Sequence, residues 1–204
     1  MIAAGEALTR LRDGNSRFVA GQLTDQALSK RELRKLAADQ APFAIILGCS
    51  DSRVPAELVF DQGFGDLFVI RVAGNIVAPS QVGSVEFAAS RYGTKLVVVM
   101  GHSNCGAITA AVEELLDGAT NESRNLRSIV DRVRPAVQGV IAGRGDVDRT
   151  TLIREAVRAN VGASVDHLRH GSALLEELVR NDGLLIVGAK YSLDTGVVSF
   201  LDPP

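Results

Sequence analysis

Four short apolar runs divide the middle and the end of the chain, and none of them alternates between apolar and polar residues. A strand with one face in water alternates, whereas a strand covered by helices on both faces does not. We therefore expect four buried parallel strands, at residues 44–47, 67–72, 96–100 and 184–187. A fifth apolar segment at 197–201 follows turn-forming residues at 193–196, which predicts a hairpin to an antiparallel edge strand.

Apolar residues with helical spacing fill the intervals between these strands. The expected helices lie at residues 55–60, 81–92, 106–116, 126–142, 151–170 and 172–181. Residues 1–40 are expected to form an N-terminal helical arm, with helices at 3–20 and 29–38, before Pro42 ends the helical stretch.

The alternation of strands and helices predicts an α/β fold. Its central β-sheet is expected to be mostly parallel, with four parallel strands plus an antiparallel edge strand, flanked by helices. No linker rich in Pro, Ser or Gly divides the 204 residues, so a single domain over 1–204 is expected.

Composition narrows the range of partners. The formal net charge of −2 gives no reason to expect nucleic acid or an anionic membrane as a partner, because such binding needs a concentrated basic face. A small-molecule substrate is expected instead. Charged residues at Glu6, Arg10, Arg12 and Asp13 interrupt the region where a signal peptide would be apolar. We expect a cytoplasmic protein.

Metal-ligand residue types follow two of the predicted strands. Cys49 comes after the first strand, and His102 and Cys105 come after the third. The carboxyl ends of parallel strands meet at one edge of a sheet, so these side chains can converge there. Zinc favours thiolate and imidazole ligands, which makes Zn2+ the expected metal. A disulfide, or two cysteines that simply fill the core, are the alternatives.

Asp51 and Arg53 lie just beyond Cys49, at alternate positions of an extended stretch. Alternate residues point the same way, so both side chains can approach the metal. The arginine would keep the carboxylate ionised and fix its orientation. A solvated surface ion pair is the alternative. His167 and His170, spaced along a predicted helix, are expected to lie on its solvated face.

The segments CSDSRVPAE and GHSNCGA together resemble the paired signature of the β-class carbonic anhydrases. The similarity continues through FDQGFGDLFVIRVAGN, GSVEFA and VGAKYSLDTG, and it is greatest with the plant-like (type I) subgroup. The resemblance implies a lyase that reversibly hydrates carbon dioxide to bicarbonate and a proton, through zinc-bound hydroxide. It implies zinc ligands at Cys49, His102 and Cys105 and a catalytic dyad of Asp51 and Arg53.

Other residues also match positions of the family. Asp51 corresponds to an aspartate that in some members becomes the fourth zinc ligand of a closed, inactive state. Gln40 and Phe68 match residues that line the substrate cleft. Ile46 stands where members regulated by bicarbonate carry Trp, so that regulation is not expected. Arg71 and Tyr191 do match other parts of that regulatory site, and for Arg71 a brace at the sheet end is the alternative. The family also implies a homodimer or homotetramer.

Two other functions fit parts of the pattern. The same scaffold and zinc could hydrolyse carbonyl sulfide or carbon disulfide, because these molecules are also linear triatomic electrophiles. A non-catalytic protein stabilised by zinc is the second alternative, and in such a protein the dyad would be dispensable. For the carbonic anhydrase, two thiolates cancel the charge of the ion, so activity is expected to rise toward alkaline pH.

Overall fold

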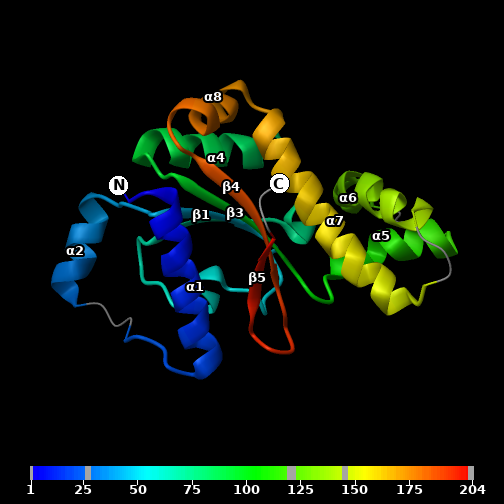
Figure 1. The fold of residues 1–204 in the computed structure, drawn as a ribbon, viewed down its shortest axis with the longest axis horizontal. Coiled ribbons are helices and arrows are strands. Elements are labelled where there is room, and N and C mark those ends of the chain that lie inside the picture. The colour runs from blue at the N-terminus through cyan, green and yellow to red at the C-terminus, as the bar shows by residue number, and fades with distance from the viewer. Residues whose placement is uncertain (1, 26–28, 119–122, 144–146, 202–204) are drawn as a thin grey trace.

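The computed structural model describes residues 2–25, 29–118, 123–143 and 147–201. Its centre is a five-stranded sheet in the order β2-β1-β3-β4-β5, as Figure 1 shows. The strands are β1 (Ala44–Gly48), β2 (Leu67–Arg71), β3 (Leu96–His102), β4 (Leu185–Tyr191) and β5 (Val198–Leu201). All neighbouring pairs are parallel except β4 and β5, which are antiparallel. The predicted α/β class and mixed sheet are therefore confirmed.

Helices cover both faces of this sheet. They are α1 (Ala4–Ala20), α2 (Lys30–Ala38), α3 (Ala56–Val59), α4 (Pro79–Tyr92), α5 (Gly106–Asp117), α6 (Arg124–Ala142), α7 (Arg149–His170) and α8 (Ala173–Asn181), with a 3-10 turn η1 at Ala73–Asn75. Apolar residues of α1 and α3 pack on one face, and those of α4, α7 and α8 pack on the other. Beyond the sheet, α5 and α6 lie beside α7 (Figure 1) and form a third apolar cluster with it.

The helix boundaries lie within two residues of those expected from sequence, and the differences have a local cause. The side chain of Ser123 accepts a hydrogen bond from the backbone N–H of Leu126, and that of Asp148 accepts one from the backbone N–H of Thr151. These caps explain why α6 and α7 begin directly after Ser123 and Asp148. The apolar pattern alone placed both starts two residues later, since it marks the first buried residue rather than the cap.

The predicted ends of the third and fourth strands were wrong. β3 continues two residues past Met100, and β4 continues four residues past Val187, where Gly188 and Lys190 interrupt the apolar run. Both extensions pair with each other, since Gly101 lies opposite Lys190 and His102 opposite Tyr191. Glycine is needed at Gly188 because a Cβ there would lie 2.8 Å from Val161 of α7. Pairing with a neighbour, rather than local apolar character, sets these strand ends.

The first helix docks on the sheet of its own chain. Ala7 and Leu11 are buried against it. Asn15 is buried as well; its side-chain amide donates to the carbonyls of Val59 and Gly196, and its oxygen accepts from the backbone N–H of Val198. By contrast, α2 has no buried residue. Among the described helices, none combines the length and the apolar character that a membrane crossing requires.

Candidate metal centre

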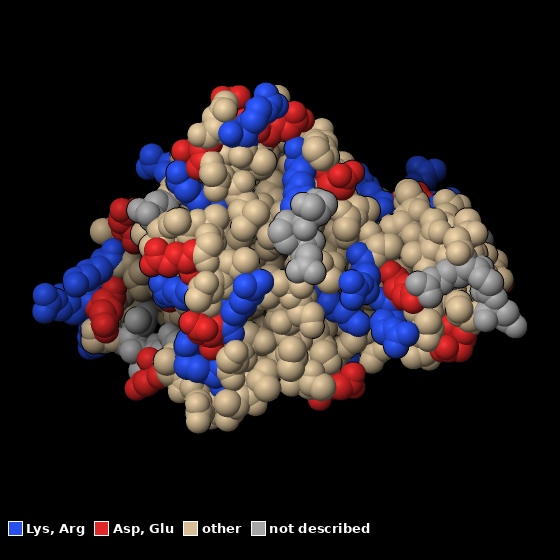
Figure 2. All heavy atoms as spheres, in the orientation of Figure 1, with Lys and Arg blue, Asp and Glu red and all other residues tan. Residues whose placement is uncertain are grey.

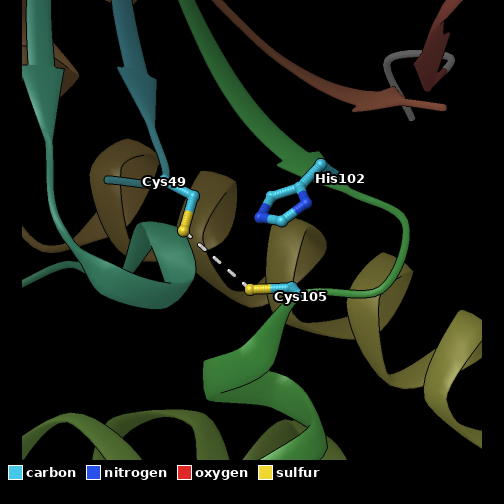
Figure 3. A group of neighbouring side chains, drawn as sticks. All are labelled: Cys49, His102 and Cys105. Atoms are coloured by element: carbon cyan, nitrogen blue, oxygen red, sulfur yellow. Dashed lines mark hydrogen bonds between the residues drawn. The ribbon is translucent and has the colours of Figure 1, made fainter. Parts of the chain in front are cut away.

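Two adjacent strands bring three metal-ligand side chains to one point. Cys49 follows β1, His102 is the last residue of β3, and Cys105 caps the N-terminus of α5. All three are at most 5% exposed. The two sulfur atoms are 3.9 Å apart, and the potential ligand atoms of the three residues all lie within 4.8 Å of one another. Figure 3 shows the thiols and the imidazole ring turned toward a common space.

This arrangement fits a zinc ion. Two sulfurs that each lie about 2.3 Å from a tetrahedral zinc are about 3.8 Å apart, close to the observed spacing. Nδ1 of His102 lies 2.9 Å from the carbonyl oxygen of Ser103, to which it must donate because a carbonyl only accepts. Nε2 therefore keeps its lone pair, and it is buried with no hydrogen-bond partner within the described residues. A buried, unpartnered nitrogen beside two thiols is the donor set that zinc prefers.

The two thiols hold one proton between them. A hydrogen bond from Cys105 lowers the pKa of Cys49 to about 4 against the opposing effect of burial, with smaller contributions from His102 and from the backbone N–H groups of Asp51 and Gly74. The same interaction raises the pKa of Cys105, because its proton is shared with the Cys49 thiolate. A divalent cation favours loss of that second proton through its own charge. One of the two thiols is therefore already favoured in the ionised form that a metal ligand requires.

Asp51 lies at the entrance to this cluster. Its two carboxylate oxygens accept from Nε and Nη2 of Arg53 at 2.9 and 2.7 Å, and the backbone N–H of Arg53 donates to it as well. These hydrogen bonds hold the pKa of Asp51 well below its usual range. Its Oδ2 is also 3.8 Å from Nε2 of His102. An ionised carboxylate, fixed by Arg53, therefore faces the three ligands.

Arg71, at the end of β2, braces the backbone of this loop. Its Nε donates to the carbonyl of Cys49 at 3.0 Å, and its Nη2 donates to the carbonyl of Asp51 at 2.5 Å. These contacts agree with the bracing role that was the alternative for Arg71. Ile46, in the position considered for bicarbonate regulation, is completely buried in β1.

A second set of supporting residues was missed by sequence reasoning. The backbone N–H of Gly74 donates to the sulfur of Cys49 at 3.4 Å, and Gly74 has the left-handed φ of 69°. Asn160 of α7 donates to the carbonyl of Gly74 at 2.8 Å, and Ser164 donates to the carbonyl of Asn75. The available signal was the pair Asn160 and Ser164, two polar residues four apart on the buried face of α7.

Gln40 and Phe68, the two residues predicted to line the substrate cleft, both contact Tyr92. Gln40 is exposed and donates to the hydroxyl of Tyr92 at 2.9 Å. Phe68 is half-buried, and its ring centroid lies 6.1 Å from that of Tyr92 and 6.2 Å from that of Phe87. These contacts join Gln40 and Phe68 to one aromatic cluster rather than to the metal ligands. Their role in substrate binding stays a prediction.

The fold and this cluster define an α/β protein with a candidate metal centre at the carboxyl edge of its sheet. The family model described as carbonic anhydrase matches residues 44–198. The chain is 40% identical over 195 residues to carbonic anhydrase 2 of Mycobacterium tuberculosis, covering 96% of this chain and 90% of that protein. It is 38% identical to the carbonic anhydrase of Mycolicibacterium smegmatis, covering 97% and 91%.

Solved structures agree with this match. A β-carbonic anhydrase of Aspergillus fumigatus superposes with a TM-score of 0.76 at 24% identity, covering 97% of this chain and 90% of that one. A tetrameric β-carbonic anhydrase of Sordaria macrospora superposes with a TM-score of 0.75 at 23% identity, covering 98% and 96%. The chain therefore belongs to the carbonic anhydrase family and is an enzyme, and it has the fold of these β-carbonic anhydrase structures.

Proposed function

We propose that this enzyme reversibly hydrates carbon dioxide to bicarbonate and a proton, with zinc held by Cys49, His102 and Cys105. The observation that carries the proposal is the unpartnered Nε2 of His102 beside two thiols at tetrahedral spacing. Curated relatives that share 38–40% of the sequence are named carbonic anhydrase, which supports the reaction. None of the relatives named above is called a hydrolase of carbonyl sulfide or carbon disulfide, so the sulfur alternative gains no support.

Zinc, when bound, would supply the Lewis acidity that makes hydroxide available near neutral pH. Asp51 is ionised and therefore only accepts hydrogen bonds. It orients a hydroxyl group that lies between it and the three ligands, so that an oxygen lone pair faces the carbon dioxide. Arg53 keeps Asp51 in this position through two parallel hydrogen bonds.

Further parts of the proposal rest on the family motifs. Gln40 and Phe68 contact the substrate, which agrees with a plant-like member, as does Ile46 in place of Trp. The enzyme works in the cytoplasm as a homo-oligomer, either a dimer or a tetramer. The tetrameric structure from Sordaria macrospora supports the oligomer.

The test is stopped-flow hydration of carbon dioxide on protein of measured zinc content, with carbonyl sulfide hydrolysis assayed in parallel. Hydration is expected to scale with zinc and to fall about a hundredfold in Asp51→Asn, because the acceptor that orients the nucleophile loses its charge. Asp117→Asn is the matched control, since Asp117 also pairs with an arginine through both oxygens but lies at the end of α5.

Full hydration by Asp51→Asn would contradict the role given to Asp51. Zinc-loaded protein that hydrolyses carbonyl sulfide but does not hydrate carbon dioxide would overturn the proposed substrate.

A further inference from the structure

A cleft outside the metal centre runs between α6, α7 and the end of β4. It has a volume of about 510 Å3. Gly139 and Val140 of α6 form one wall, and Arg154 and Arg158 of α7, with Lys190 of β4, form the other. Because Arg154 and Arg158 are four residues apart on one helix, both side chains reach the same space. The cleft therefore gathers three basic groups from two elements.

These basic groups make few direct contacts, although carboxylates lie near them: Glu155 lines the same cleft, Asp194 lines the adjoining cavity, and Arg154 interacts electrostatically with Asp148. Within the described residues, neither Arg158 nor Lys190 has a hydrogen bond or an ion pair, and Arg154 has only a 3.4 Å contact with the hydroxyl of Thr151. Glu155 also lines the cleft, and this residue is not free, because it interacts with another residue. Burial, together with the charges of Arg154 and Arg158, lowers the pKa of Lys190.

Several other arginines form ion pairs. Arg17 binds Asp61, Arg134 binds Glu114, and Arg149 binds Asp117. Over most of the face seen in Figure 2 basic and acidic side chains are interspersed, and a group of basic side chains lies over the N-terminal half of α7. Around this cleft the three basic groups outnumber the one carboxylate, that of Glu155. Their mutual repulsion is relieved when an anion binds among them.

A second cavity, of about 240 Å3, shares Arg154 and Lys190 with the first and extends to Ser103 and Asn104. These two residues form the loop between the metal ligands His102 and Cys105. The loop is fixed from the same side, because the hydroxyl of Ser103 accepts from the backbone N–H of Leu193 at 2.9 Å. An occupant of the cleft would therefore lie close to the back of this loop.

We propose that the cleft is a binding site for a small oxyanion with two negative charges, namely phosphate or a phosphate monoester. Two guanidinium groups bind phosphate oxygens in a bidentate manner, and the ammonium of Lys190 adds a third, half-buried charge. Gly139 and Val140 leave an uncharged wall for an organic substituent. The site is separate from the proposed reaction and does not depend on it.

The experiment is a titration of isotopically labelled, zinc-loaded protein with inorganic phosphate at constant ionic strength, followed by NMR. The amide signals of Arg154, Arg158, Lys190 and Ser103 are expected to move and to saturate. Chloride at the same ionic strength is expected to leave these amide signals unshifted. Arg158→Gln and Lys190→Met are each expected to weaken binding about tenfold, because each removes one of three charges from the site.

Two further variants locate the site. Arg91→Gln removes an exposed arginine of α4 and is expected to leave the affinity unchanged. Arg53→Gln removes the basic group at the metal centre and is also expected to leave phosphate binding unchanged. Glycerol 3-phosphate distinguishes the two sources: tighter binding than that of inorganic phosphate assigns the site to monoesters, and equal binding assigns it to free phosphate.

The absence of saturable shifts would overturn the proposal. So would shifts confined to residues around Cys49 and His102, or binding that is lost in Arg53→Gln and kept in Arg158→Gln, because phosphate would then bind at the metal centre.

Discussion

The carboxyl edge of the sheet, which carries the candidate metal cluster and is called the metal edge below, and helix α2 of the N-terminal arm are stabilised in opposite ways. At the metal edge, Cys49 after β1 accepts a hydrogen bond from η1, and η1 accepts hydrogen bonds from buried side chains of α7, across long stretches of sequence. In α2 no residue is buried, and a reciprocal capping box between Ser29 and Glu32 satisfies the helix start locally. A change at the metal edge should therefore affect the whole molecule, whereas a change in α2 should stay local.

The largest effect is expected from His102→Ala. It removes one of three ligands, so zinc affinity should fall by more than about a hundredfold, beyond the range seen for outer partners of ligands. Metal analysis after dialysis against a chelator measures this loss. His167→Ala is the control, since His167 is exposed on α7 and should leave the zinc content unchanged. A His102→Ala protein that keeps its full zinc content would refute the ligand assignment.

Asn160→Leu tests the support behind Cys49. The variant leaves the buried carbonyl of Gly74 without its hydrogen bond, so the free energy of unfolding should fall by about 1–3 kcal/mol. Zinc affinity should fall about tenfold, since Gly74 would no longer be held against the sulfur. Urea unfolding and chelator competition measure the two effects. Asn181→Leu is the control, because Asn181 makes only an exposed hydrogen bond within α8. It should change the free energy of unfolding by less than about 0.5 kcal/mol.

Asp61 ties α1 to the loop after α3, and it gives the stability a dependence on pH. Burial opposes its ionisation, but hydrogen bonds from Arg17 and Thr24 outweigh burial and hold its pKa below the usual value. The ionised group therefore stabilises the fold above about pH 4, the value for an unfolded chain, and this contribution disappears as the pH falls through the lower folded pKa.

Asp61→Asn should accordingly lower the free energy of unfolding by about 1 kcal/mol at pH 7 and flatten its decline in acid. Denaturant unfolding at pH 7, 5 and 3 measures both quantities. An unchanged decline in acid would mean that other carboxylates account for it.

The smallest effect is expected from Ser29→Ala. Loss of the capping box should cost about 1 kcal/mol of helix stability. Because α2 buries nothing, faster hydrogen exchange should be confined to residues 30–38, and zinc content should not change. Ser128→Ala, in the exposed part of α6, should leave exchange in α2 as it was. Loss of zinc from Ser29→Ala would show that the arm and the metal edge are coupled.

Sequence reasoning was most accurate where one segment carries its own signal. The uninterrupted apolar runs of β1 and β3 predicted two strands, and the residues directly after them include all three residues of the candidate metal cluster. It failed where structure depends on a distant partner. The end of β4 is set by pairing with β3, and Asn160 acts on Gly74, 86 residues away. No local pattern of apolar residues encodes such contacts.

His102 is itself a paired residue of the sheet, opposite Tyr191, and every residue of β3 is buried. An imidazole on a loop swings away when the loop moves, but this one is fixed to the middle strand of five. The ligand is therefore displaced only when that strand opens, which is among the costliest local unfolding events of a domain. For zinc held as proposed, metal release and amide exchange in β3 would then follow from the same opening, and the lifetime of the ion would reflect the kinetic stability of the sheet.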